Sequence, residues 1–308
     1  MAAPGSGASV GVYGEPLHDL VDIPTDASRF SPLAPAQAAI EQADSGAFSR
    51  FIVAAPPGVL ERRFVLAHAL RALEAGGELV ALAPKDMGGA RLRRELEGFD
   101  CVVEETARRH HRICTATRPA EPIGLEDAIA EGGLQIAEDL GLWTQPGIFS
   151  WDRIDPGTTL LLASGLKFKG DGADFGCGVG LLAREVLRAS EVTTLALIDI
   201  DARAIQAARR NIDDPRASFL QHDLRSLSEG LKGLDFVVMN PPFHTGGRED
   251  RGLGQAFVRS AAAALRRGGL LRLVANIGLP YEAVLAEAFR EVKPLSQKHG
   301  YKLIEARK

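Results

Sequence analysis

The order of apolar and polar runs in the second half of the chain predicts strands and helices in alternation. Short apolar runs typical of buried strands lie at 173–178, 194–200, 217–223, 235–240 and 270–276. Stretches with helical character, such as 181–189 and 202–211, separate several of them. This alternation predicts an α/β fold with a mostly parallel sheet, whose ligands bind beside the carboxyl ends of the strands.

Two parts of the chain repeat one order of elements. The early part spans 50–118 and the late part spans 235–307. Each reads as a strand, a corner of two adjacent prolines, a helix, a Gly-Gly pair, a strand, a helix and a final strand. We therefore predict an internal duplication, in which the early copy is a truncated α/β domain with little more than half of the fold.

A stretch rich in proline, glycine and acidic residues lies between the two copies, at 117–133. Such a composition is typical of a linker. We place the domain boundary near residue 124, which gives a first domain of residues 1–123 and a second domain of residues 124–308.

The late proline corner, Asn240–Phe243, combines a rigid backbone with polar groups. Adjacent prolines forbid helix and lack backbone donors, so the Asn240 amide and the proline carbonyls are held still as acceptors. Fixed acceptors suit the two hydrogens of a planar amine, and Phe243 can stack on its ring. Ala55 and Gly58 stand at the matching positions of the early copy, so we expect that corner to be structural only.

A glycine-rich loop in the second domain has the pattern D-x-G-x-G-x-G. Its residues are Asp174, Gly176, Gly178 and Gly180. Glycines let the chain turn tightly and let a ligand approach the backbone. The loop lies between a predicted strand and a predicted helix, as a nucleotide-binding loop does.

Two further acids end the next strands. Asp199 lies 19 positions after Gly180, a spacing suited to a carboxylate that accepts both ribose hydroxyls. Asp223 ends the following strand, where it can accept from an adenine amino group. Asp201 directly precedes a helix, and we expect it to be the N-cap. Three successive strand ends thus predict an adenosine site.

The local sequence discriminates among adenosine ligands. A nicotinamide dinucleotide favours G-x-G-x-x-G, which the stretch GCGVGLL does not match. An acid directly before the loop suits an ammonium group better than a pyrophosphate, and the sequence has no Walker motif. These features favour S-adenosylmethionine as the cofactor.

Composition limits the remaining possibilities. The 308 residues are 45% hydrophobic with a net charge of −4, which argues against a generally basic nucleic-acid coat. Three scattered cysteines support neither a disulfide framework nor a zinc site. No apolar run is long enough for a membrane span, and the N-terminus lacks signal-peptide features. We expect a cytoplasmic protein without a metal; the oligomeric state is not readable from the sequence.

With these features together, the sequence resembles class I S-adenosylmethionine-dependent methyltransferases that modify amino groups. The stretches PGIFSWDRIDPGTTLLL, DFGCGVG, MNPPFH and LPYEAVLAEAF are similar, more narrowly, to the bacterial ribosomal RNA guanine-N2 methyltransferases. The resemblance implies a Rossmann-like class I methyltransferase sheet, preceded by a degenerate methyltransferase-like domain for substrate recognition or structure. It also implies S-adenosylmethionine as cofactor and ribosomal RNA or the small ribosomal subunit as partner.

The resemblance and the pattern together give two sets of site residues. The expected catalytic residues are Asn240, Pro241, Pro242 and Phe243. The expected cofactor-binding residues are Phe149, Thr158, Asp174, Phe175, Gly176, Gly178, Gly180, Asp199, Ile200, Asp223, Leu224 and Asn240.

Alternatives to guanine methylation stay open. The Asn-Pro-Pro-Phe corner also occurs in enzymes that methylate adenine N6 of RNA or DNA, or a protein glutamine. An alternative of another class is a non-catalytic RNA-binding or ribosome-assembly module, against which the acids at 174 and 199 and the amide at 240 argue.

Overall fold

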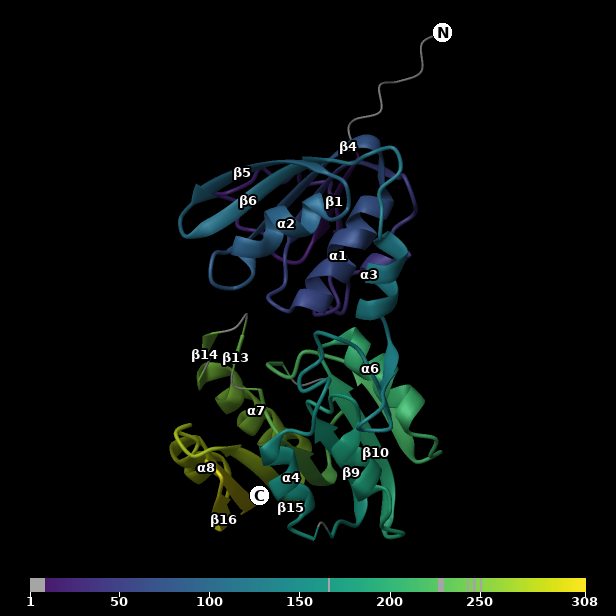
Figure 1. The fold of residues 1–308 in the computed structure, drawn as a ribbon. Helices are drawn as coiled ribbons and strands as arrows, with labels where there is room; N and C mark the ends of the chain where they lie inside the picture. Colours follow the sequence, from purple (N-terminus) through teal and green to yellow (C-terminus); the bar gives the residue numbers. More distant parts are fainter. Residues whose placement is uncertain (1–8, 166, 227–229, 243, 246–247, 250) are drawn as a thin grey trace. The chain divides into compact units, whose positions relative to one another are not determined.

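The computed structural model describes residues 9–165, 167–226, 230–242, 244–245, 248–249 and 251–308. The chain forms two compact units, Met1–Leu134 and Gln135–Lys308. Figure 1 shows a sheet with its own helices in each unit. Each unit also has its own hydrophobic core.

The later unit contains a seven-stranded sheet in the order β11-β10-β9-β12-β15-β17-β16. Its strands are β9 (Gly170–Phe175), β10 (Val192–Asp199), β11 (Ala217–Gln221), β12 (Leu234–Met239), β15 (Leu265–Asn276), β16 (Glu291–Lys298) and β17 (Tyr301–Arg307). Neighbouring strands run parallel except that β17 is antiparallel to both β15 and β16. The predicted Rossmann-like α/β sheet is confirmed.

Helices cover both faces of this sheet because alternate residues of its strands point to opposite sides. The helices are α4 (Pro156–Leu162), α5 (Leu181–Val186), α6 (Ala202–Asn211), α7 (Arg251–Ala264) and α8 (Glu282–Ala288). Val237 and Met239 of β12 pack with α7 and α8. Phe236 and Val238 pack with α4, α5 and α6 on the other face. The apolar run before the proline corner is therefore buried on both sides.

Short hairpins complete the later unit. They are formed by β7 (Gln135–Ala137) with β8 (Leu142–Thr144), and by β13 (His244–Thr245) with β14 (Arg248–Glu249). Among the described residues, no helix combines the length and the apolar character that crossing a bilayer requires.

The earlier unit contains a six-stranded sheet in the order β2-β1-β3-β4-β6-β5. Its strands are β1 (Val10–Tyr13), β2 (Ser28–Phe30), β3 (Phe48–Ala54), β4 (Leu73–Pro84), β5 (Val102–Arg108) and β6 (His111–Thr117). Its helices are α1 (Val59–Ala72), α2 (Leu92–Glu97) and α3 (Leu125–Gly132), with 3₁₀ turns η1 (Ile40–Gln42) and η2 (Gly89–Arg91). The helices pack on one face of the sheet. The segment around Val21 and Ile23 covers the other face.

The two sheets share one topology. The order β2-β1-β3-β4-β6-β5 matches β10-β9-β12-β15-β17-β16, with the same pairs parallel and antiparallel. Gly11 lies against the ring of Phe51, as Gly172 lies against the ring of Phe236. Only β11 has no counterpart in the described part of the earlier sheet, so that unit is more complete than half of a fold. Duplication as the origin of this likeness stays a prediction.

The expected linker contains a helix that belongs to the earlier unit. Leu125 and Ala128 of α3 are buried in its core. A side chain at Gly132 would collide with Phe64 of α1, so the two helices pack closely. The chain therefore divides between Leu134 and Gln135 instead of near residue 124, because apolar burial outweighs the polar composition of the segment.

Candidate active site

The glycine loop between β9 and α5 requires glycine at three positions. Gly176, Gly178 and Gly180 have φ of 73°, 52° and 85°, in the left-handed region where a β-carbon is unfavourable. The N–H of Gly176 donates to the Ile198 carbonyl over 2.8 Å, which fixes the start of the loop against β10. The loop therefore presents its backbone at the carboxyl ends of β9 and β10, the place predicted from the sequence.

Asp174 is a fully buried carboxylate near the end of β9. Neither of its oxygens has a hydrogen-bond partner among the described residues. Burial, and then the neighbouring Asp199, raises the pKa of Asp174 from 3.8 to about 8. A buried carboxylate without a partner is costly, and a bound cation would relieve that cost. Binding of a methionine ammonium group by Asp174 stays a prediction.

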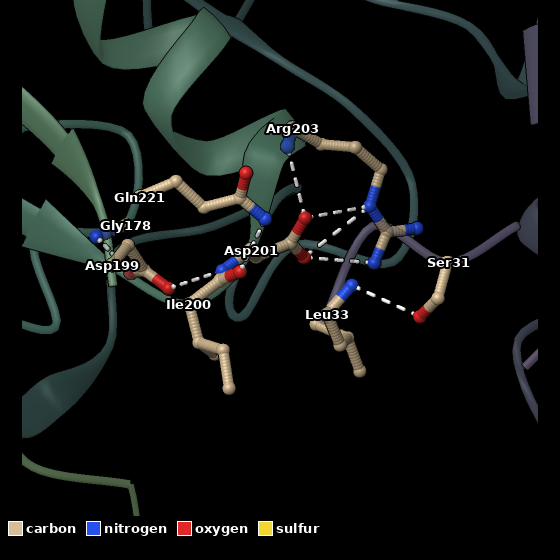
Figure 2. Close-up of polar contacts among 8 residues, drawn as sticks. All are labelled: Ser31, Leu33, Gly178, Asp199, Ile200, Asp201, Arg203 and Gln221. Atoms are coloured by element: carbon tan, nitrogen blue, oxygen red, sulfur yellow. Dashed lines mark hydrogen bonds and ion pairs between the residues drawn. The ribbon is translucent and has the colours of Figure 1, made fainter. Parts of the chain in front are cut away.

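Asp199 ends β10 and is tied into the glycine loop. Figure 2 shows its two oxygens accepting from backbone N–H groups, Oδ2 from Gly178 at 2.9 Å and Oδ1 from Asp201 at 3.0 Å. Burial outweighs these hydrogen bonds and raises the pKa of Asp199 to about 6. Each oxygen keeps a further acceptor site, which a ribose hydroxyl could use.

Asp201 is the N-cap of α6, as predicted. Its carboxylate accepts from the N–H of Arg203 at 2.9 Å and pairs with the Arg203 guanidinium at 2.8 Å. Nearby, the side-chain amide of Gln221 donates to the Ile200 carbonyl at 3.0 Å, which ties β11 to the end of β10 (Figure 2).

Asp223 is engaged within its own turn. Its carboxylate accepts from the N–H of Arg225 at 2.9 Å and from the Arg225 guanidinium at 2.6 Å. This arginine lowers the pKa of Asp223 below its ordinary value. The next residue, Leu224, is buried, and its carbonyl accepts from the Ser260 hydroxyl at 2.6 Å. A role for Asp223 toward adenine stays a prediction.

A pocket lies between the glycine loop and the segment 140–158 of the later unit. The residues predicted from the sequence that line it are Phe149, Thr158, Gly176, Gly178 and Asn240. The lining does not include the other predicted residues, which are Asp174, Phe175, Gly180, Asp199, Ile200, Asp223, Leu224, Pro241 and Pro242. The ring of Phe149 is 63% exposed at this pocket. The glycine loop and Asn240 of the proline corner therefore line one pocket.

Asn240 follows the last residue of β12 and is held by residues at the start of α4 that line the same pocket. Its Nδ2 donates to Asp155 Oδ2 at 2.9 Å and to Thr158 Oγ1 at 3.0 Å. Pro241 is buried and Pro242 is exposed. Phe243, predicted to stack on the substrate, lies outside the described residues.

Sequence reasoning missed Asp155. It caps α4 by accepting from the N–H of Thr158 at 3.0 Å, and Pro156 occupies the first turn. An aspartate directly before a proline at the start of an apolar helix is a recognisable cap signal. Its contact with Asn240 joins residues 85 positions apart, which no local pattern reveals.

The corner of the earlier unit has its acceptors occupied internally. The guanidinium of Arg62, a fully buried residue, donates to the carbonyls of Pro56 at 3.0 Å and Pro57 at 2.7 Å. The same group forms a bidentate pair with Glu95, with both N–O distances 2.7 Å.

Comparison with known proteins adds a family. The model of the methyltransferase small domain matches residues 139–305. "Ribosomal RNA small subunit methyltransferase C" of Shewanella piezotolerans is 32% identical over 235 residues, 75% of this chain and 69% of that protein. The protein of the same name from Yersinia enterocolitica is 31% identical over 82% of this chain and 72% of its own length.

A solved structure covers both units. It is described as a T. thermophilus 16S rRNA N2 G1207 methyltransferase in complex with AdoMet and guanosine. The two structures superpose with a TM-score of 0.80 at 26% identity, over 99% of this chain and 90% of the other.

Proposed function

The chain belongs to the methyltransferase small-domain family and, within it, to the ribosomal RNA small subunit methyltransferase C group, and we propose that it methylates the N2 amine of a guanine in small-subunit ribosomal RNA. The methyl donor is S-adenosylmethionine. One observation carries this proposal: Asn240 of the proline corner lines the same pocket as the glycine loop. An acceptor for the substrate amine therefore lies beside the loop expected to hold the donor.

The residues present suit this donor. The buried carboxylate of Asp174 has no hydrogen-bond partner among the described residues, and we infer that it pairs with the ammonium group of the donor. Asp199 has acceptor capacity left for ribose hydroxyls, and the glycines leave room against the backbone. When bound, S-adenosylmethionine supplies an electrophilic methyl group on a sulfonium. A role of the first domain in substrate recognition or in structure, and a cytoplasmic location, are part of the same proposal.

The corner activates the amine by holding its hydrogens. An exocyclic base amine is a weak nucleophile because its lone pair is delocalised into the ring. We infer that Asn240 Oδ1 and the Pro241 carbonyl accept its two hydrogens, so that the lone pair is drawn out of the ring plane. These fixed acceptors stabilise the positive charge that develops on the nitrogen, by a few kcal/mol. The methylated, cationic amine then loses a proton to water.

Alignment supplies the rest of the acceleration. Positioning two reactants in a rigid site corresponds to an effective concentration of roughly 10⁵ M or more. We infer that Phe243 stacks on the base and contributes about 1 to 3 kcal/mol of binding. A paired guanine has to be flipped out of its helix to reach the pocket.

The test is transfer of a labelled methyl group to unmodified small-subunit ribosomal RNA, presented free and as assembled subunits. The modified nucleoside is identified by mass spectrometry. We expect N2-methylguanosine. Label on adenine or on a protein glutamine would identify a different substrate. Cofactor binding without transfer to any of these would indicate a non-catalytic RNA-binding role.

A further inference from the structure

The side-chain amide of Asn240 is held by two partners outside the proline corner. Both hydrogens of Nδ2 are engaged, one by Asp155 Oδ2 at 2.9 Å and one by Thr158 Oγ1 at 3.0 Å. Both partners belong to the start of α4, far from Asn240 in sequence. The amide is therefore fixed by a separate element of the fold.

These partners determine which end of the amide faces the pocket. The two ends of an asparagine side chain have nearly the same shape, so its hydrogen bonds decide its orientation. An ionised carboxylate can only accept, so the NH₂ end of Asn240 has to face Asp155. The oxygen end is then the one left for the substrate amine. If the amide were reversed, its NH₂ group would face the substrate amine, and neither group could accept a hydrogen bond from the other.

Asp155 is itself held in place. It is 8% exposed, and its Oδ1 accepts from the Tyr301 hydroxyl at 3.1 Å while Oδ2 caps α4. Tyr301 begins β17, so the carboxylate is fixed from the sheet as well as from its own helix. A β-carbon at Gly157 would lie 2.7 Å from the Tyr301 ring and 2.8 Å from Asp155 Oδ2. The first turn of α4 is thus shaped to admit this contact.

We propose that Asp155, with Thr158 and Tyr301, positions the Asn240 amide so that its oxygen faces the substrate amine. The three are positioning residues that act through Asn240. The inference rests on the proposed function, since it assumes that Asn240 accepts from an amine. For Thr158, predicted from the sequence to bind the cofactor, it adds a contact with Asn240.

The first test compares two substitutions of Asp155. Asp155→Ser keeps a helix cap but is too short to reach both Asn240 and Tyr301. We expect its kcat to fall about 10- to 100-fold, the loss typical of a hydrogen bond to a charged group, while S-adenosylmethionine affinity changes less than about twofold. Asp155→Asn still offers an oxygen to Asn240, and we expect it to retain most of the activity.

A second test uses the tyrosine. We expect Tyr301→Phe to lower kcat about 3- to 10-fold, because it removes one of the hydrogen bonds that hold the Asp155 carboxylate and leaves the other contacts of Asp155 in place. In the Asp155→Ser background the same change should have no further effect, because both residues act on one group. Tyr281→Phe is the matched control. Tyr281 is buried in the same unit, its hydroxyl has no partner among the described residues, and we expect unchanged turnover.

A readout without substrate separates this inference from the proposed function. In ¹⁵N-labelled protein, the side-chain NH₂ signals of Asn240 are assigned by their loss in Asn240→Ala. We expect slow hydrogen exchange in the wild type and in Asp155→Asn, and fast exchange in Asp155→Ser. If the wild type methylates another amine, the substrate proposal fails while this test still decides the orientation.

Two results would overturn the inference. One is protection of the Asn240 amide that is the same in Asp155→Ser as in the wild type. The other is an Asp155→Ser protein that binds S-adenosylmethionine more weakly but turns over normally at saturation, which would make Asp155 a cofactor contact.

Discussion

Each unit ends one strand in a proline corner, and the two corners differ in what occupies their acceptors. After β3, the carbonyls of Pro56 and Pro57 accept from the buried Arg62 guanidinium. After β12, Asn240 donates to Asp155 and lines a pocket. The same strand order positions both corners. The fold therefore builds the corner, and a few side chains decide whether it stays open to a ligand.

The neighbouring strand end shows the same difference. Gly11 contacts Phe51 as Gly172 contacts Phe236, so the strand register places Tyr13 where the later unit has Asp174. Tyr13 fills its position with a buried ring. The later unit keeps an ionisable group there without a partner among the described residues. The earlier unit fills this position with a side chain that packs in its core, and the later unit holds a buried carboxylate there at a cost in stability.

The largest expected effect comes from a substitution in the proline corner of the later unit. We expect Asn240→Ala to lower methyl transfer about 10³-fold, the typical loss for a fixed polar group that stabilises developing charge. S-adenosylmethionine affinity, measured by calorimetry, should stay nearly unchanged. Ala55→Asn in the earlier unit is the matched control and should leave the rate of the wild type unaltered. Normal turnover of Asn240→Ala would end the proposed mechanism.

The next effect comes from a substitution beside the proline corner of the earlier unit. We expect Glu95→Ala to destabilise the protein by about 3 to 5 kcal/mol, because it leaves the buried guanidinium of Arg62 without its ion-pair partner. Urea unfolding measures this change. Glu97→Ala, which removes an exposed pair with Arg93, is the control and should cost less than about 1 kcal/mol. Equal losses for the two variants would contradict the role assigned to Arg62.

A smaller effect separates binding from stability at the open site. We expect Asp174→Asn to weaken S-adenosylmethionine binding about 10- to 100-fold, because an ammonium group loses its charged partner. The same change should make the ligand-free protein more stable at pH 8, because a buried charge is removed. Calorimetry and thermal unfolding measure the two quantities. Both falling together would indicate that Asp174 is a structural residue.

Within a single pH unit, the smallest effect is the pH dependence of stability that comes from the same group. The folded-state pKa of Asp174 is raised from 3.8 to about 8, so its protonated form favours folding. That contribution is complete below pH 4 and is lost as the pH rises to about 8, by no more than about 1.4 kcal/mol per pH unit. The wild type should show this slope between pH 5 and 8 more strongly than Asp174→Asn. Identical slopes would refute the assignment.

The sequence predicted the elements whose signals are local. Alternating apolar runs gave the sheet of the later unit, and positive φ angles at Gly176, Gly178 and Gly180 agree with the loop read from their spacing. Asp201 was identified as a cap because capping chemistry lies within one helical turn.

Features that depend on distant contacts were missed. The strands β1 and β2 are only four and three residues long, and their partners lie elsewhere in the chain. The helix α3 lies in a stretch of linker-like composition and is stabilised by packing on α1. Nothing in the local sequence around Arg62 distinguishes it from an exposed helical arginine, although it is fully buried in the fold. In each case tertiary packing outweighs local preference.

The position of β17 affects how the chain is assembled during translation. It is synthesised after β16 yet lies between β15 and β16, and it carries Tyr301. In a nascent chain, β16 therefore has no strand to pair with until residues 301–307 have left the ribosome. The earlier unit repeats the arrangement with β6 between β4 and β5, so each sheet is closed by the last of its strands to be made.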